Sequence, residues 1–246
     1  MKRAIVTGAG NGIGSAIARA LATANYVVGV LDHDPDAAQN TANSLPNAIA
    51  LAADVTKADE VERAFAQFGA VPDLVVCNAG IVRFGPLIEQ SLIDLRAVLD
   101  VNLWGTMVVA IAAARRMAKG GSGHVVCMTS INSATPGPGV GAYPASKAGV
   151  AQFVKQLAIE CGPAGVRVNA VSPGFIDAGM SAPIYSDPAV RDRRAAGVPL
   201  RRLGTAEDIA NAVLWLDSSG ASYVSGHELV VDGGVVNSML AQLPRS

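Results

Sequence analysis

Residues 7–14 read Thr-Gly-Ala-Gly-Asn-Gly-Ile-Gly, and this turn decides the fold. It follows a short β-branched run, 4–7, and opens an alanine-rich helical run, 12–24. Glycines between a first strand and a first helix let the backbone approach a pyrophosphate, and the helix N-terminus supplies N–H groups. The spacing is T-G-x-x-x-G-x-G, because Ile13 stands where G-x-G-x-x-G needs a glycine. A dinucleotide site is therefore predicted, using Gly8, Asn11, Gly12, Ile13 and Gly14.

Short apolar strands alternate with longer helical runs along the rest of the chain. Near-continuous apolar strands indicate a sheet covered on both faces, and short connections give right-handed crossovers. The expected strands are 4–7, 27–31, 49–52, 74–77, 124–130, 167–171 and 228–231. The expected helices are 12–24, 35–44, 57–68, 91–119, 142–160 and 206–217. We therefore predict one α/β domain over residues 1–246, a Rossmann-type, doubly wound parallel sheet of about seven strands with helices on both faces.

The composition disfavours several other classes of protein. The net charge is −1 and no run of Lys or Arg occurs, so no nucleic-acid or membrane partner is predicted. The longest apolar stretch, 107–114, falls short of the ~20 residues of a membrane span. Cys77, Cys127, Cys161 and the three histidines are scattered, so we expect neither disulfides nor a metal site. A cytoplasmic protein that binds a small molecule is predicted.

One segment, 174–205, breaks the alternation of strands and helices. It contains several prolines, three closely spaced arginines and little periodicity. A long irregular segment in a compact domain is usually a lid or a binding loop. This segment also follows the carboxyl end of a strand, where open α/β sheets bind their ligands. We therefore expect a substrate-binding lid rather than a disordered excursion.

Asp32 ends the second predicted strand and indicates which dinucleotide binds. A carboxylate at this position accepts hydrogen bonds from the adenosine ribose hydroxyls and repels a 2′-phosphate. The turn offers Asn11 rather than an arginine or lysine, and His33 is mostly neutral. NAD is therefore the predicted cofactor. A solvated turn residue, or an N-cap before Pro35, is the structural alternative for Asp32.

The segment Tyr143-Pro144-Ala145-Ser146-Lys147 carries the strongest catalytic signal. Proline is accepted only in the first turn of a helix, so a helix should begin near Tyr143. The i, i+4 spacing then places Tyr143 and Lys147 on one helix face. A nearby ammonium and a positive nicotinamide stabilise a phenolate, so we expect the pKa of Tyr143 to fall. The alternative is a solvated lysine beside a half-buried tyrosine.

With these motifs in view, the sequence resembles the short-chain dehydrogenase/reductase family over almost its whole length. Any one motif could arise by chance, but their order along seven strands is specific. The further motifs that carry the resemblance are Asp54-Val55, Asn78-Ala79-Gly80, Asn102, Ser130, Pro173-Gly174 and Val231-Asp232-Gly233-Gly234.

The resemblance implies a hydride-transferring enzyme in which Tyr143 is the general acid/base. Lys147 would hold the nicotinamide ribose hydroxyls and lower the pKa of Tyr143, and Ser130 would hydrogen-bond the substrate oxygen. Asn102 would help to hold a water that relays protons from Lys147 to solvent. The alternative for Asn102 is a helix-interior amide bonded to the backbone.

The resemblance also implies the remaining cofactor contacts. Asp54 and Val55 would grip adenine, and residues 78–80 would steady the central strand and pass beneath the cofactor. Pro173, Gly174 and Ile176 would lie beside the nicotinamide, with Ile176 contacting the carboxamide through its backbone. Two positions depart from the family: Cys77 replaces an asparagine, and Ala178 replaces a threonine whose hydroxyl bonds the carboxamide. Ser181 is a possible substitute for that hydroxyl.

The substrate is the least determined feature. No charge follows Ser130 closely, so we expect an uncharged secondary alcohol or ketone with an apolar or cyclic body. The predicted substrate contacts are Ser130, Asn132, Tyr143, Phe175 and Met180, with Ile131, Pro136, Val140 and Tyr185 as further pocket residues.

Two rival functions remain open. The same motifs occur in 3-oxoacyl-(acyl-carrier-protein) reductases, for which Arg191, Arg193 and Arg194 could dock an acidic carrier; Asp32 argues against their usual cofactor, NADP. A non-catalytic NAD sensor or structural subunit is the alternative of a different class. The apolar helices 104–114 and 150–159, together with the resemblance to a mostly tetrameric family, predict a homotetramer.

Overall fold

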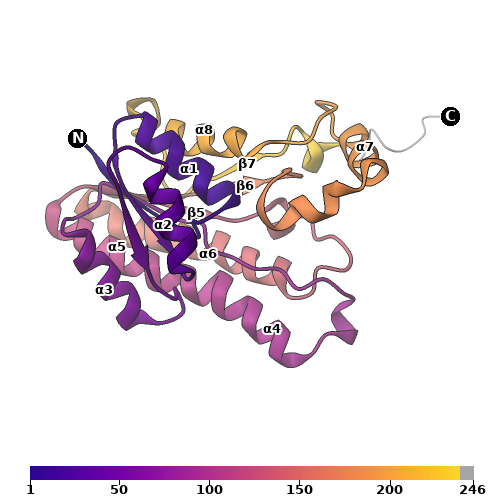
Figure 1. Ribbon diagram of the computed structural model, residues 1–246, viewed down its shortest axis with the longest axis horizontal. Helices are drawn as coiled ribbons and strands as arrows, with labels where there is room; N and C mark the ends of the chain where they lie inside the picture. The colour runs from indigo at the N-terminus through magenta and orange to yellow at the C-terminus, as the bar shows by residue number, and fades with distance from the viewer. Residues whose placement is uncertain (239–246) are drawn as a thin grey trace.

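The computed structural model describes residues 1–238, which form one seven-stranded parallel sheet covered by helices on both faces (Figure 1). The strands are β1 (Arg3–Thr7), β2 (Val27–Asp32), β3 (Ala48–Ala52), β4 (Leu74–Cys77), β5 (Gly123–Met128), β6 (Val166–Pro173) and β7 (Glu228–Val231). Their order is β3-β2-β1-β4-β5-β6-β7, so the winding reverses between β1 and β4. The predicted fold and all seven strands are confirmed. Ligands of open α/β sheets bind where the winding reverses, at the carboxyl ends of the strands.

Two apolar clusters cover the sheet because successive strand residues point to opposite faces. Ile5 of β1 packs with one cluster and Val6 with the other. The Val6 cluster is covered by α1 (Gly12–Thr23), α2 (Pro35–Asn43) and α8 (Ala206–Leu216). The Ile5 cluster is covered by α3 (Ala58–Phe68), α5 (Thr106–Gly120) and α6 (Tyr143–Cys161). This arrangement is the predicted three-layer architecture.

The fifth strand is shorter than the predicted 124–130. It ends at Met128, and Ser130 instead caps a short 3₁₀ helix, Ile131–Ser133. The Ser130 hydroxyl accepts a hydrogen bond from the amide of Asn132 at 3.2 Å. Serine is favoured at a helix N-cap because its hydroxyl oxygen accepts a backbone N–H that has no partner within the helix. Ser130 therefore stands just beyond the carboxyl end of β5.

The single helix predicted over 91–119 has three parts. α4 (Leu92–Leu99) leads into a π-helical segment, Asp100–Gly105, and then into α5. The whole run, Leu92–Gly120, is long and apolar enough to cross a membrane. The expectation from residues 107–114 therefore underestimated the length of the apolar helix. Half of its most apolar window is buried inside the protein. Its buried residues include the face of α5 that covers the sheet.

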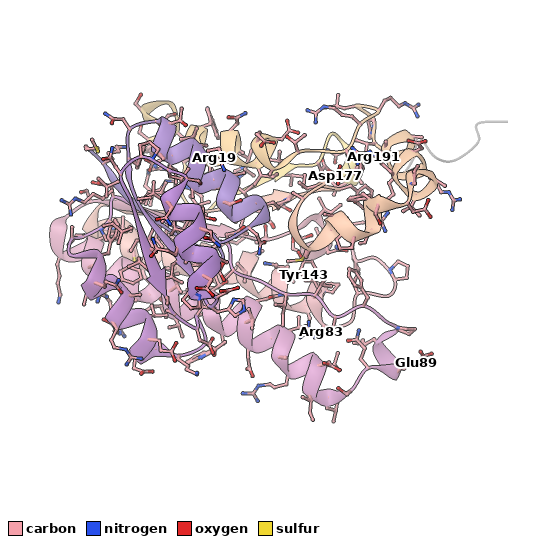
Figure 2. The ribbon with its side chains drawn as sticks, in the orientation of Figure 1. Arg19, Arg83, Glu89, Tyr143, Asp177 and Arg191 are labelled. Atoms are coloured by element: carbon pink, nitrogen blue, oxygen red, sulfur yellow. The ribbon has the colours of Figure 1, made fainter. Side chains whose placement is uncertain are left out.

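The segment 174–205 is more regular than predicted. It contains a 3₁₀ helix, Gly179–Ser186, and α7 (Pro188–Gly197), which Asp187 caps by accepting the amide of Ala189 at 2.9 Å. Sequence reading missed this Asp-Pro start signal, in which an N-cap precedes a proline in the first turn. Arg191 of α7 also pairs with Asp177 at the start of the segment (Figure 2).

A buried polar network lies at the amino ends of the strands, away from the reversal of winding. Its centre is Asp217, at the carboxyl end of α8, which accepts the Tyr26 hydroxyl at 2.6 Å and the Lys2 ammonium at 3.0 Å. His124 of β5 contacts the other carboxylate oxygen at 3.1 Å. Burial alone would raise the pKa of Asp217, but the hydrogen bonds from His124, Tyr26 and Lys2 outweigh it and lower the pKa to about 2. The network joins α8 to the sheet.

Candidate active site

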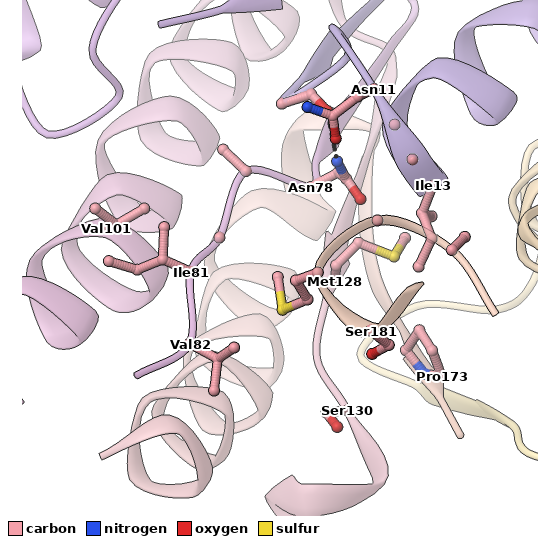
Figure 3. A pocket seen from close by; sticks show the side chains of 18 of the residues that line it. Asn11, Ile13, Asn78, Ile81, Val82, Val101, Met128, Ser130, Pro173 and Ser181 are labelled. Carbon is pink, nitrogen blue, oxygen red and sulfur yellow. Dashed lines mark hydrogen bonds between the residues drawn. The ribbon is translucent and has the colours of Figure 1, made fainter. Parts of the chain in front are cut away.

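A cavity of about 1340 Å³ opens at the carboxyl ends of the strands where the winding reverses. It runs from the glycine-rich turn to Ser130, as the side chains of Asn11, Ile13 and Ser130 show in Figure 3. The structure places every predicted cofactor residue on its wall: Gly8, Asn11, Gly12, Ile13, Gly14, Asp32, Asp54, Val55, Asn78, Ala79, Gly80, Tyr143, Lys147, Pro173, Gly174 and Ile176. Residues far apart in the sequence therefore converge on one site.

The glycine-rich turn has no room for side chains at two key positions. A Cβ atom on Gly14 would lie 2.1 Å from the carbonyl oxygen of Gly8, so only glycine lets α1 begin against the turn. Gly12 has φ +55°, and a Cβ atom there would lie 2.7 Å from the Cα of Gly179. The turn is thus a bare backbone cradle at a helix N-terminus, which suits a pyrophosphate. It also lies directly against the start of the predicted lid.

Asn78 ties this turn to the neighbouring strand. Its side-chain amide donates hydrogen bonds to the carbonyl oxygens of Thr7 at 3.0 Å and Gly8 at 3.1 Å. Its backbone amide donates to the Thr7 hydroxyl at 3.0 Å. These bonds join the carboxyl ends of β1 and β4, the two strands between which the winding reverses. Asn78 therefore lines the cavity and holds the glycine-rich turn against β4.

Asp32 is buried at the end of β2 and faces the same turn. One carboxylate oxygen accepts the amide of Gly10 at 2.9 Å, and the other contacts the His33 ring at 2.9 Å. The N-cap of α2 is Asp34 rather than Asp32, and Asp32 is only 5 % exposed. Both structural alternatives for Asp32 are therefore wrong. Its position is the one from which a carboxylate would meet a ribose.

Asp54 and Val55 follow β3 and line the same end of the cavity. The Asp54 carboxylate accepts the amide of Thr56 at 2.9 Å and its hydroxyl at 2.8 Å. Burial raises the pKa of Asp54, but these bonds and Lys57 outweigh it, so the pKa is lowered overall. Lys57 lies 3.6 Å from Asp54 and 3.2 Å from Glu60. The lysine at this end is therefore already neutralised by carboxylates.

Tyr143 and Lys147 share the first turns of α6, which begins at Tyr143 as predicted. The Lys147 ammonium donates to the carbonyl oxygen of Met128 at 2.8 Å and lies 5.6 Å from the centre of the Tyr143 ring. Lys147 is 3 % exposed, and this burial lowers its pKa to about 8. The alternative of a solvated lysine is wrong. The side chain instead projects into the interior, onto the cavity wall.

The pKa of Tyr143 moves in the opposite direction to the prediction. Burial raises it, and this effect outweighs the hydrogen bond with Ser130, which lowers it. The Lys147 ammonium is held at the Met128 carbonyl rather than at the phenol oxygen. The chain alone therefore does not produce the expected downward shift. A positive charge bound beside the phenol would lower this pKa.

Asn102 is fully buried and is the one predicted catalytic residue that does not line the cavity. It lies in the π-helical segment Asp100–Gly105. Its side chain accepts the amide of Ile81 at 2.8 Å and donates to the carbonyl oxygen of Ile81 at 2.9 Å. It also donates to the Ser146 hydroxyl at 3.1 Å. The Asn102 side chain is therefore bonded to the backbone, as the alternative interpretation predicted. Through these bonds it joins the loop after β4 to α6.

The opposite end of the cavity is mostly apolar. Of the predicted substrate residues, Ser130, Asn132, Tyr143, Phe175 and Met180 line it, as do Ile131, Val140 and Tyr185, whereas Pro136 does not. The side-chain oxygen of Asn132 accepts the amide of Gly137 at 3.0 Å, which fixes the side chain and leaves its NH₂ group for a ligand. The lining residues that were not predicted from the sequence include Val82, Phe84, Ile184 and Arg194. Residues 82–84 come one residue after the Asn-Ala-Gly motif, and Arg194 belongs to the arginine cluster of the predicted lid.

Ile176 and Ser181 lie near the position that departs from the family, Ala178. Ile176 forms a parallel bridge with Gly204, whose amide and carbonyl bond to Phe175 and Asp177. In this pairing the amide and carbonyl of Ile176 point away from Gly204. Ser181 lines the cavity near Pro173 (Figure 3). Both residues therefore line the cavity beside the position that departs from the family.

The bare glycine cradle, the buried carboxylate after β2 and the Ser-Tyr-Lys cluster define an oxidoreductase that binds a nicotinamide dinucleotide. Comparison with known proteins agrees. A family model described as enoyl-(acyl carrier protein) reductase matches residues 8–236. The chain belongs to the short-chain dehydrogenase/reductase family, and it acts on CH–OH groups or the corresponding carbonyls.

Relatives of this chain are named for different substrates. The chain is 38 % identical over 243 residues to the 3-oxoacyl-[acyl-carrier-protein] reductase FabG of Chlamydia muridarum, covering 95 % of this chain and 97 % of the relative. It is 39 % identical over 239 residues to the cis-4-hydroxycyclohexanecarboxylate dehydrogenase of Sinomonas cyclohexanicum, covering 94 % and 95 %.

Solved structures with this fold differ in both substrate and cofactor. A 3-oxoacyl-[acyl-carrier protein] reductase from Brucella melitensis with bound NAD has a TM-score of 0.88 at 33 % identity, covering 95 % of this chain and 90 % of its own. A gluconate 5-dehydrogenase from Burkholderia cenocepacia in complex with NADP and tartrate has a TM-score of 0.90 at 30 % identity, covering 96 % and 95 %. Both cofactors thus occur among proteins of this fold.

Proposed function

We propose that this protein is an NAD-dependent dehydrogenase that oxidises a secondary alcohol to a ketone and catalyses the reverse reduction. The observation that carries the proposal is the cluster of Ser130, Tyr143 and Lys147 on one cavity wall, opposite a bare glycine cradle. Such a site places an acid/base beside the carbon that loses or gains a hydride. The bound nicotinamide supplies the hydride chemistry, and the chain supplies the binding and the proton transfers.

In this proposal Tyr143 moves the proton and Ser130 orients the substrate. The Ser130 hydroxyl bonds the phenol oxygen and can bond the substrate oxygen at the same time. The phenol then gives a proton to a carbonyl oxygen, or takes one from an alcohol. Lys147 uses one of its three N–H groups on Met128, which leaves two for the ribose hydroxyls. Its position is fixed by that bond before any ligand arrives.

The preference for NAD rests on the charges at the adenosine end. Asp32 presents a buried carboxylate, which a 2′-phosphate would meet with repulsion. His33 already contacts Asp32, and Lys57 is paired with Asp54 and Glu60. No other lysine or arginine lines this end within residues 1–238. We therefore expect NAD to be favoured over NADP by at least tenfold in kcat/KM, about 1.4 kcal/mol.

Reduction of carrier-linked 3-oxoacyl chains is the second candidate, because the Chlamydia relative carries that name at 38 % identity. The structure offers less for carrier docking than the sequence suggested. Of the three arginines, Arg191 is paired with Asp177 and Arg194 lines the cavity, so only Arg193 is free at the surface. One exposed arginine is a weak docking site for an acidic partner.

An assay of cyclic and aliphatic secondary alcohols against a 3-oxoacyl thioester, each with both cofactors, tests the proposal. We expect NAD with an alcohol to give the highest kcat/KM, and Asp32→Ala to erode the preference mainly by admitting NADP. Equal use of both cofactors by the parent enzyme would contradict the role of Asp32. A higher kcat/KM for the thioester would make the carrier-linked reaction the function.

We also propose a cytoplasmic homotetramer. Trp104 is 53 % exposed and Ile159 is 73 % exposed, on the two helical segments predicted to pack across a two-fold axis. Large apolar side chains that stay exposed favour association of subunits.

A further inference from the structure

One cationic side chain enters the apolar end of the cavity without a partner of opposite charge. Arg194 lies in the last turn of α7 and lines the cavity together with Phe175, Ile184 and Tyr185. It is half-buried, whereas Arg191 and Arg193 on the same helix are exposed. Among residues 1–238 no carboxylate lies within ion-pair distance of its guanidinium. A partly buried, unpaired guanidinium is costly, so its retention at a binding site favours an anionic ligand.

Four carboxylates on the neighbouring segments have other partners. Asp177 pairs with Arg191, and Asp187 accepts the amide of Ala189. Asp208 pairs with Arg202, and Asp232 accepts the amides of residues 234 and 236. None of these groups neutralises Arg194. The other cation of this end is Lys147, which is held on Met128.

Arg194 is also held in place before any ligand arrives. Its guanidinium carbon lies 5.1 Å from the centre of the Phe175 ring and 5.6 Å from that of Tyr185. One guanidinium nitrogen donates to the Tyr185 hydroxyl at 3.4 Å. The aromatic rings contact the flat face of the guanidinium. The N–H groups at its edge can therefore donate to a carboxylate. A fixed planar fork loses little side-chain entropy when it binds such a group.

We propose that Arg194 binds a carboxylate of the substrate, so that the substrate is a hydroxy acid, or its oxo acid, with an apolar carbon body. The body would lie against Val82, Phe84 and Phe175, and the alcohol would meet Ser130 and Tyr143 at the other end. This inference rests on the dehydrogenase function proposed above. The sequence predicted an uncharged substrate because no charged residue follows Ser130 closely. The structure adds the positive charge of Arg194, which comes from a distant part of the chain, so we now expect an acid.

The test compares acids with their neutral esters, using the 2-, 3- and 4-hydroxycyclohexanecarboxylates and their methyl esters with NAD. We expect the best acid to exceed its ester at least tenfold in kcat/KM. Arg194→Gln should lower that kcat/KM at least tenfold, mainly through KM, and should leave the ester and the KM for NAD within twofold of the parent. Arg194→Lys should retain part of the effect, because it keeps the charge and loses the fork.

Arg193→Gln is the matched control, since Arg193 precedes Arg194 on the same helix and is exposed. It should leave every constant within twofold of the parent. Equal rates for acid and ester, or equal losses in both arginine variants, would overturn the proposal. A raised KM for NAD in Arg194→Gln would assign this arginine to the cofactor instead. Thermal melting of each variant separates these outcomes from misfolding.

If no alcohol were oxidised, the dehydrogenase proposal would fail, and calorimetry would still decide the role of Arg194. Cyclohexanecarboxylate and cyclohexanecarboxamide have the same body and differ in charge. With NADH present, the parent should bind the carboxylate at least tenfold more tightly, and Arg194→Gln should remove the difference. No preference for the carboxylate in the parent would sink the inference.

Discussion

Tyr143 and Lys147 lie one helical turn apart, yet burial moves their pKa values in opposite directions. Removing charge from water disfavours the phenolate and the ammonium alike, so the pKa of Tyr143 rises while that of Lys147 falls to about 8. Both residues therefore favour their neutral forms more than they would in water. Proton transfer at Tyr143 depends on what binds beside it, and an unliganded site is poorly suited to ionise the phenol.

Replacing Tyr143 with phenylalanine tests the acid/base assignment. The variant keeps the ring and its packing but loses the transferable proton, so turnover should fall by at least ~10²-fold. Binding of NAD, measured by calorimetry, should stay within a few fold of the parent. Turnover of Tyr143→Phe close to that of the parent would show that another group moves the proton.

At the scale of the element, the two ends of the sheet hold polar residues for different purposes. The carboxyl ends present groups to a cavity, whereas the amino ends enclose the network around Asp217, which α8 contributes from its last turn. The side chain of Asp217 is 5 % exposed and is hydrogen-bonded by His124, Tyr26 and Lys2. Buried carboxylates of this kind stabilise the fold only while they stay ionised and bonded.

Asp217→Asn should destabilise the protein by about 2 kcal/mol at pH 7, since the pKa of Asp217 lies well below its ordinary value. The folded pKa is depressed, so the contribution is present above pH 4 and is lost as the pH falls toward 2. Urea unfolding should therefore show a larger difference between parent and variant at pH 5 than at pH 3. Asp192→Asn, on the exposed surface of α7, is the control and should change little. A constant difference across this range would argue against the ionised network.

At the scale of the whole molecule, several large apolar side chains stay exposed on α4 and α6. Leu92 is 81 % exposed and Ile93 82 % exposed at the start of α4, and Ile159 is 73 % exposed on α6. These helices belong to the layer that also covers the Ile5 cluster of the core. Exposed apolar side chains on such a layer favour the association of subunits proposed above.

Light scattering at micromolar concentration should report a homotetramer, with a dimer as the smaller alternative. Ile159→Lys places a charge on the proposed interface and should shift the mass to a smaller species. Val71→Lys, which alters an apolar residue that is 50 % exposed outside these helices, should leave the mass unchanged. A monomeric parent would show that the exposed helix face serves another purpose.

The strands, the helix that begins at Tyr143 and the gathering of the predicted cofactor residues around one cavity could be predicted from the sequence. Local rules decide these features: strand periodicity, proline in the first turn, and glycines where a backbone must approach closely. Parallel strands bring their carboxyl ends to one edge, so residues such as Asp32 and Asn78 could be placed at the site without coordinates. The helix interruption at Asp100–Gly105 was missed, because no composition signal marks a π-helical turn.

Only the tertiary structure decided what surrounds each of these groups. It raised the pKa of Tyr143 through burial, joined Asn102 to the backbone of Ile81, and turned Arg194 into the cavity while leaving Arg193 outside. Each of these results depends on distances between segments remote in the sequence. Desolvation and pairing of charge follow from how the layers pack, whereas residue type and spacing describe only the chain along its own length.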